Sequence, residues 1–181
     1  SDALGGAVCT DDPAWHQKMV FAQKALGLQP SPFDCWLITR GIKTLPLRLR
    51  QQMANAAALA DQLAHHAQVN WVRYPHRPDH PQHSLAMQQM SGGGAIVTIG
   101  VEASRERAYA MCKALQWFTM AESLGGVESL ICHPATMTHA SVSTEVKQKL
   151  GISDGLIRLS VGCEDAADLL ADLEQALCLL R

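Results

Sequence analysis

The sequence predicts an α/β domain in which helices cover one face of a small sheet, preceded by a long helix. Two observations lead to this fold class. From Val69 onward, stretches with a two-residue apolar period alternate with helical stretches, in the order strand, helix, strand, helix, strand, loop, strand, helix. Before Val69, apolar residues recur near the helical period from Leu45 to Leu63. The 181 residues, 48% of them hydrophobic, are enough for one sizeable core.

The N-terminal part is expected to be mainly helical. Residues 7–10 are expected to form a short strand. An aspartate N-cap at residues 11–12 and Pro13 in the first turn then predict a helix that Gly27 ends. Helix resumes after the prolines at residues 30–32. In the long helix, the expected core stripe is Leu45, Leu49, Met53, Ala56, Ala60 and Leu63. Outside that stripe we expect Arg48, Arg50, Gln51, Gln52 and Asn55.

The remaining elements are short. The expected strands are residues 69–74, 95–100 and 156–162. The expected helices are residues 84–90, a helix capped by Ser104, residues 143–150, and a last helix with acids 164–165 in its first turn. The core stripe of that last helix is expected to be Leu169, Leu173, Ala176 and Leu180.

One expected strand carries a single arginine. Ile157, Leu159 and Val161 fall on one face of this strand, so Arg158 points away from the core. A guanidinium on a rigid strand suits a carboxylate, because its donors match two oxygens at once. On the pattern alone, a surface arginine with its stem laid on the sheet remains the alternative.

A second feature is the glycine pair at residues 125–126. Two adjacent glycines permit positive φ and close backbone approach. Ser123, just before the pair, offers a hydroxyl and nearby N–H groups to an anion. An ordinary glycine turn is the alternative.

Charge and hydropathy exclude several classes of partner. The net charge of −2 provides no basic stripe for nucleic acid. No apolar run approaches the length of a membrane span, and residues 1–6 do not resemble a signal peptide. The six cysteines contain no CxxC pair, which favours reduced thiols and a cytoplasmic location.

Three histidines in a proline-rich segment raise the possibility of a metal site. His76, His80 and His83 lie close together in the sequence. Prolines fix this segment as a loop, and no cysteine or paired carboxylate accompanies the histidines. We therefore expect no metal site.

Several long motifs in fixed order resemble the Cys/Met-metabolism (trans-sulfuration) family of pyridoxal-phosphate (PLP) enzymes, such as cystathionine γ-synthase, γ-lyase and β-lyase. The motifs are residues 118–130 (FTMAESLGGVESL), 133–141 (HPATMTHAS) and 151–162 (GISDGLIRLSVG), with 31–34 (SPFD), 40–45 (RGIKTL) and 80–83 (HPQH) before them. The resemblance covers essentially the whole chain, and the number of motifs makes it specific.

The resemblance implies a fold and an activity. The fold would be the C-terminal domain of an aspartate-aminotransferase-like, fold type I PLP enzyme, with a mostly antiparallel sheet. The activity would be β- or γ-elimination, or γ-replacement, on small sulfur amino acids in a homo-oligomer, either tetramer or dimer. Arg158 would bind the substrate α-carboxylate near Ser123. Glu122 would favour cystathionine as substrate, and Thr138 would lie near the site.

The resemblance also implies what this chain lacks. In the family the Schiff-base lysine comes a few residues before a segment similar to residues 1–6, and no lysine here matches its motif. We therefore expect no catalytic residue in this chain, with PLP held only in a longer enzyme. The expected segments are residues 1–30 from the cofactor domain, 31–66 as linking helices and 67–181 as the C-terminal domain. The alternative is a non-catalytic, free-standing fragment or interaction module without cofactor.

Overall fold

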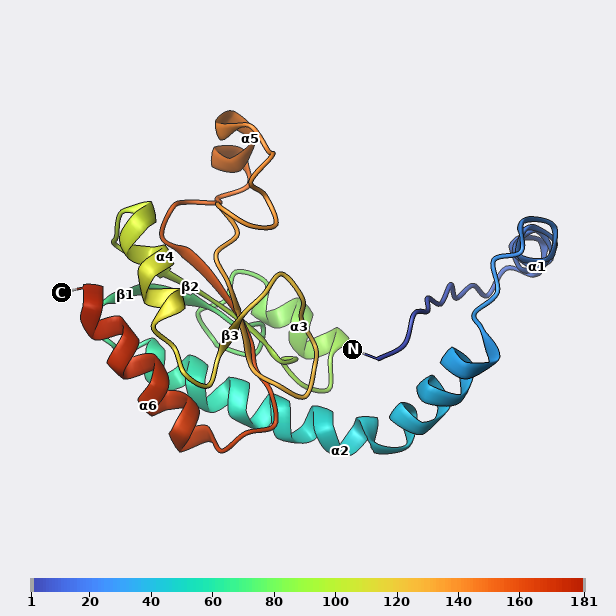
Figure 1. Ribbon diagram of the computed structural model, residues 1–181, viewed down its shortest axis with the longest axis horizontal. Coiled ribbons are helices and arrows are strands. Elements are labelled where there is room, and N and C mark those ends of the chain that lie inside the picture. The colour runs from blue at the N-terminus through green and yellow to red at the C-terminus, as the bar shows by residue number, and fades with distance from the viewer. Residues whose placement is uncertain (1, 181) are drawn as a thin grey trace. The chain divides into compact units, whose positions relative to one another are not determined.

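The structure of the chain is a computed structural model that describes residues 2–180 (Figure 1). Contacts divide the chain into two compact units, unit 1 (Ser1–Pro46) and unit 2 (Leu47–Arg181). The boundary falls inside one long helix, α2 (Pro32–Leu63). The three-segment division expected from the sequence stays a prediction.

Unit 1 contains helix α1 (Pro13–Leu26) and the first part of α2. Asp12 caps α1 as expected: its side chain accepts hydrogen bonds from the N–H groups of Ala14 and Trp15. Gly27 ends the helix with a φ of 69°, a left-handed conformation that glycine adopts without steric cost. The strand expected at residues 7–10 is wrong, because no strand of the described chain pairs with this segment.

Unit 2 contains a five-stranded sheet in the order β1-β2-β5-β4-β3. The strands are β1 (Val69–Arg73), β2 (Ile96–Val101), β3 (Thr119–Met120), β4 (Leu130–Cys132) and β5 (Leu156–Ser160). All neighbouring pairs are antiparallel except β3 with β4. The helices besides α2 are α3 (His83–Gln89), α4 (Arg105–Lys113), α5 (Thr144–Lys149), α6 (Ala166–Leu177) and a final 3₁₀ turn, η1 (Cys178–Leu180).

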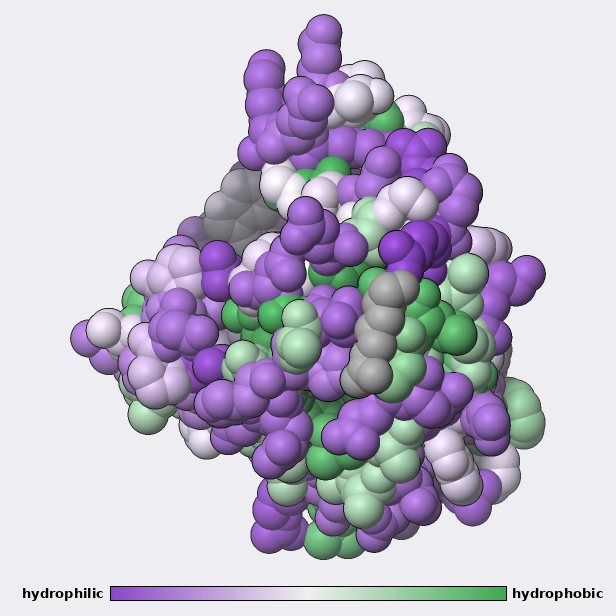
Figure 2. All heavy atoms as spheres, turned by 90° about the vertical axis from the view of Figure 1, so that its left-hand side faces the viewer, coloured by the Kyte–Doolittle hydropathy of each residue, from purple (hydrophilic) through white to green (hydrophobic). Residues whose placement is uncertain are grey.

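The core lies between one face of the sheet and helices α2, α4 and α6. Ile157 and Leu159 of β5 are fully buried, and Val161 just after the strand is as well. The stripe expected on the last helix is confirmed, since Leu169, Leu173, Ala176 and Leu180 are all buried. Figure 2 shows the side of unit 2 that carries α4 and α6, where hydrophilic residues predominate. These helices are therefore amphipathic, with their apolar faces turned to the sheet.

The expected face of α2 needs a correction. Gln52 and Asn55 are buried, with 1% and 2% of their surface exposed, although the sequence pattern put them outside the core stripe. Leu45 and Leu49, expected in the stripe, are instead exposed. The buried face of α2 therefore begins with two amides and continues with Ala56, Leu59 and Leu63.

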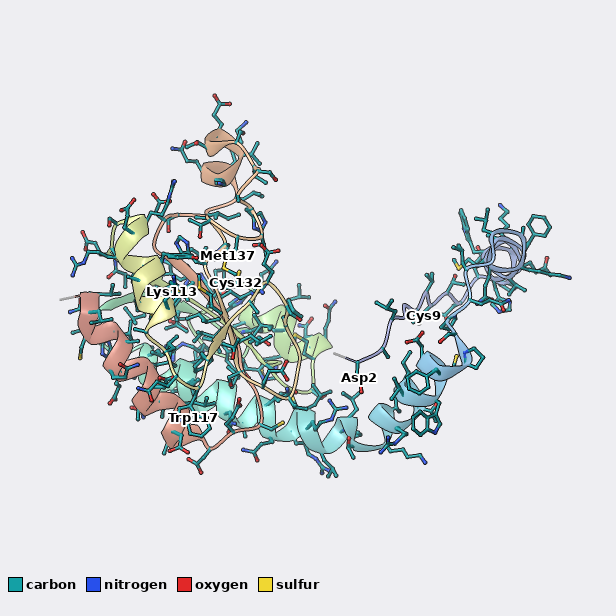
Figure 3. All side chains as sticks on the ribbon, viewed as in Figure 1. Asp2, Cys9, Lys113, Trp117, Cys132 and Met137 are labelled. Carbon is teal, nitrogen blue, oxygen red and sulfur yellow. The ribbon has the colours of Figure 1, made fainter. Side chains whose placement is uncertain are left out.

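A buried carboxylate joins α6 to the segment before β3. Asp172 accepts hydrogen bonds from the backbone N–H groups of Gln116, Trp117 and Phe118, at 2.8 to 3.2 Å. Trp117 accordingly lies beside α6 in Figure 3. Only 4% of Asp172 is exposed, and these three donors compensate for its loss of water.

None of the helices in residues 2–180 combines the length and apolar character that a membrane crossing requires.

Candidate functional site

Arg158 occupies the centre of the sheet, on the face opposite the core. In the strand register it lies between Thr98 of β2 and Cys132 of β4. Its Nη2 donates to the backbone carbonyl oxygens of Glu122 and Ser123, at 2.8 and 3.0 Å. Its Nε is buried and has no hydrogen-bond partner among the described residues. The guanidinium is therefore held in place through Nη2, and no hydrogen bond of the described chain uses its other two nitrogens.

The segment between β3 and β4 runs over Arg158 and its neighbour Ser160. Gly125 has a φ of 77°, which turns its N–H onto the Ser160 hydroxyl oxygen at 2.8 Å. Ser160 shares the Arg158 face of β5 and is 1% exposed. The glycine turn expected from the sequence is thus anchored to the strand that carries the arginine.

A second set of bonds ties the end of this segment to the chain after β5. The Ser129 hydroxyl accepts from the Gly162 N–H and donates to the Glu164 carboxylate, both at 2.8 Å. The same carboxylate accepts the Ser129 N–H at 2.6 Å. Cys163 N–H also donates to the Val127 carbonyl at 2.8 Å. Two of the sequence motifs, residues 118–130 and residues 151–162, therefore form one hydrogen-bonded unit around the C-terminal end of β5.

Helix α2 contacts both motifs through its buried amides. The Gln52 amide donates to the Gly126 carbonyl oxygen. The Asn55 amide donates to the carbonyl oxygens of Gly162 and Glu164, at 3.1 and 2.7 Å. Each of these bonds satisfies a polar group that burial has removed from water.

A buried histidine follows β4, the strand that pairs with β5 beside Arg158. His133 follows β4 and has no exposed surface. Its Nε2 lies 2.7 Å from the Asp154 carbonyl oxygen, which can only accept, so Nε2 carries a proton. The His133 N–H donates to the Met137 sulfur at 3.4 Å. Figure 3 shows Met137 near Cys132 at this end of β4. His133 therefore links the end of β4 to the loop that leads into β5.

The structure brings three of the four expected site residues together. Arg158 contacts Glu122 and Ser123, although through their backbone carbonyls, and both side chains are exposed. The hydroxyl of Thr138 is also exposed and lies 2.8 Å from Nδ1 of its neighbour His139. The hydrogen bonds of the described chain do not connect Thr138 to Arg158.

Sequence reasoning missed five residues that shape this site. They are Gln52, Asn55, Ser129, Ser160 and Glu164. The sequence placed Gln52 and Asn55 by their helical period and Glu164 by its position near a helix start, and it assigned no role to Ser129 or Ser160. A signal was available for one of them, because Ser160 follows Arg158 by two residues and so shares its face of the strand.

His76 and His80 lie between β1 and α3, and His83 begins α3. Within residues 2–180, no group of three or more His, Cys, Asp or Glu side chains has the geometry to hold a metal ion. His80 Nδ1 instead accepts the Gln82 N–H at 3.1 Å.

Comparison with known proteins decides the family. The model of the Cys/Met metabolism PLP-dependent enzymes matches residues 1–178. The chain belongs to this family. The resemblance inferred from the sequence motifs is thereby confirmed.

Individual relatives carry three different activity names. The chain is 49% identical to cystathionine gamma-synthase of Mycobacterium tuberculosis, over 98% of this chain and 45% of the relative. It is 48% identical to cystathionine gamma-lyase of Dictyostelium discoideum, over 98% of this chain and 46% of the relative. It is 46% identical to cystathionine beta-lyase of Coxiella burnetii, over 98% of this chain and 46% of the relative. The chain therefore spans about half the length of the curated relatives it matches.

Solved structures of the family confirm the fold class. Cystathionine gamma synthase of Xanthomonas oryzae pv. oryzae, solved in complex with cystathionine, superposes with a TM-score of 0.88 at 48% identity. The match covers 93% of this chain and 44% of that one. The chain thus has the α/β fold of the fold type I family, with the mostly antiparallel sheet and the long preceding helix that were expected.

A covalent anchor for PLP would be a lysine amine. Arg158, Glu122 and Ser123 form no hydrogen bond with a lysine in the described chain. Lys147, for instance, donates instead to the carbonyl oxygens of Ala135 and Ala140. The Arg158 guanidinium is therefore suited to bind an anionic ligand.

Proposed function

We propose that this chain is the C-terminal part of a PLP-dependent trans-sulfuration enzyme, in which Arg158 binds the α-carboxylate of a sulfur amino acid. The observation that carries the proposal is the state of the guanidinium: one nitrogen is fixed by two backbone carbonyls, and the buried Nε lacks a partner. A guanidinium can bond two carboxylate oxygens at once, and this one keeps donors that no hydrogen bond of the described chain uses.

The reaction class comes from the family. When bound in the complete enzyme, PLP supplies the electron sink for β- or γ-elimination and γ-replacement. The part of this chain is to bind and orient the substrate. Because the relatives are named both as synthases and as lyases, the proposed reaction is trans-sulfuration of a cystathionine-like amino acid, by elimination or by replacement.

Three further residues have proposed roles at the same site. Ser123 lies beside the carboxylate, because its carbonyl already contacts Arg158. The exposed Glu122 carboxylate receives the distal ammonium group of cystathionine. Thr138 is a secondary contact, supported by the family motif and by its exposed hydroxyl.

The surface of unit 1 supports assembly with further protein. This unit exposes large apolar side chains that a solvated surface rarely gathers in such number: Trp15, Val20, Phe21, Leu26, Phe33, Trp36 and Ile42. We propose that the rest of the longer enzyme and a homo-oligomer, either a dimer or a tetramer, together cover them. The cytoplasmic location expected from the cysteine spacing stays part of the proposal.

The decisive experiment examines the polypeptide as its own cell produces it. The intact mass of that polypeptide is compared with the mass of this chain. The polypeptide is then treated with borohydride in the presence of PLP, to trap any Schiff base. Finally, its turnover of L-cystathionine is measured. A larger polypeptide that traps equimolar PLP and turns over L-cystathionine supports the proposal. A polypeptide of this mass that traps no PLP overturns it and favours the non-catalytic module.

A further inference from the structure

The two buried amide side chains of α2, Gln52 and Asn55, donate hydrogen bonds to backbone carbonyls far along the chain. A core-facing helix position normally carries an apolar side chain, because a primary amide loses hydrogen bonds to water on burial. Gln52 and Asn55 both occupy such positions and both donate to backbone carbonyls outside their own helix. These acceptors, Gly126 and Gly162, belong to the two motifs that surround Arg158.

Asn55 is fully used in this arrangement. Its Nδ2 donates to Gly162 and Glu164, and its Oδ1 accepts from the Gln51 amide at 2.8 Å. The Glu164 carbonyl that it contacts belongs to the residue whose carboxylate holds Ser129. Asn55 thus fixes the chain after β5, and through Glu164 it fixes the end of the 122–129 segment.

Gln52 contacts the same 122–129 segment at Gly126. Its acceptor, Gly126, follows Gly125, whose N–H is held by Ser160. Two and three residues before Gly125 are the carbonyls that hold the Arg158 guanidinium. A displaced Gly126 would therefore move the carbonyls of Glu122 and Ser123 relative to β5.

We infer that Gln52 and Asn55 are positioning residues for the Arg158 site. From α2 they bond the Gly126 and Gly162 carbonyls. These bonds fix the position of the 122–126 segment relative to the Arg158 side chain. The inference rests on the proposed function in one respect, that the ligand of Arg158 is the substrate carboxylate.

The first test is a double-mutant cycle in the PLP-loaded enzyme that contains this chain. Gln52→Met keeps the side-chain size and removes the donor to Gly126. We expect it to raise the KM for L-cystathionine about tenfold and to change kcat by less than about threefold. In an Arg158→Lys background the same substitution should add no further increase in KM, because its effect passes through Arg158. Effects that simply add in the double variant would overturn the inference.

Asp172→Asn is the matched control. Asp172 is also buried and polar, but within residues 2–180 its carboxylate bonds only the 116–118 segment and Gln175. This variant should lower the melting temperature and leave the KM unchanged. If Asp172→Asn raises the KM as much as Gln52→Met, the effect is one of general stability and the inference fails.

A second readout needs no activity and is made on the 181-residue chain. The Gly125 N–H, bonded to Ser160, should exchange with solvent about tenfold faster in Gln52→Met and at an unchanged rate in Asp172→Asn. Unchanged exchange in Gln52→Met would overturn the inference even if the enzyme acts on L-cystathionine. Conversely, an Arg158→Lys enzyme with a normal KM would disprove the proposed carboxylate role, while the exchange rates would still decide the positioning role.

Discussion

The Arg158 guanidinium is bonded to the backbone of Glu122 and not to its carboxylate. Nη2 lies 2.8 Å from the Glu122 carbonyl oxygen, and the Glu122 side chain is exposed. A direct ion pair would have neutralised the arginine before any substrate arrived. The neutral Glu122 carbonyl orients the guanidinium without neutralising its positive charge. The Glu122 carboxylate is therefore not used by Arg158.

Arg158→Lys should weaken substrate binding. A lysine keeps the charge but loses the planar fork that a carboxylate matches. We expect kcat/KM of the complete enzyme for L-cystathionine to fall about tenfold to hundredfold, as for the loss of a hydrogen bond to a charged group. Arg73→Lys is the control, because Arg73 faces Thr98 in the same row of the sheet but is exposed and lies two strands away. Equal kcat/KM values for the two variants would contradict the proposed role.

Glu122→Gln should change substrate preference. The substitution retains the backbone carbonyl that holds Arg158 and removes only the side-chain charge. The KM for L-cystathionine should rise about tenfold, because the distal ammonium loses a charged partner. The KM for a sulfur amino acid without a distal ammonium should stay the same. A parallel rise for both substrates would mean that residue 122 acts on the α-carboxylate end of the site.

Gly162→Ala should destabilise unit 2. A Cβ at this position would overlap the Val127 carbonyl oxygen and lie 2.6 Å from the Glu128 carbonyl carbon, both of them backbone atoms that cannot swing away. We expect a loss of about 1–3 kcal/mol in the free energy of unfolding, measured in urea. Gly41→Ala is the control, because a Cβ there meets open space inside a helix. That variant should gain up to about 1 kcal/mol. A neutral Gly162→Ala would mean that the two motifs separate easily.

The strand with Arg158 could be predicted because its signal is local. Alternation of Ile157, Arg158 and Leu159 decides which side chains face the core, whatever the neighbouring strands are. The helix caps at Asp12 and Ser104 are local in the same way.

The buried amides could not be predicted because their partners are distant. Gln52 bonds a residue 74 positions away, and Asn55 bonds one 107 positions away. Polar residues on a helix are normally assigned to its solvent face, and only the tertiary fold reveals acceptors that make their burial favourable. The same reason hid the role of Glu164, which the sequence marked only as an acid near a helix N-terminus.

Asp172→Asn should destabilise the chain without affecting the Arg158 site. The carboxylate accepts three backbone N–H bonds, whereas an asparagine has one acceptor oxygen and brings its own N–H donors towards those groups. We expect a loss of about 1.5–3 kcal/mol in the free energy of unfolding, the range for hydrogen bonds to a charged group. Asp168→Asn, at an exposed position of the same helix, should cost far less. Similar losses in the two variants would show that the Asp172 cluster is not a stabilising link.

Cys112 should make the chain less stable in alkali. Desolvation in the core, with a smaller contribution from Cys132, raises the pKa of the Cys112 thiol from 9.0 to about 12. Above pH 9 the unfolded chain loses this proton while the folded chain keeps it, so the folded state binds more protons and stability falls as pH rises towards 12. The free energy of unfolding should therefore decline more steeply between these pH values in the wild type than in Cys112→Ala. Parallel curves would indicate that the thiol ionises as readily in the folded chain as in the unfolded one.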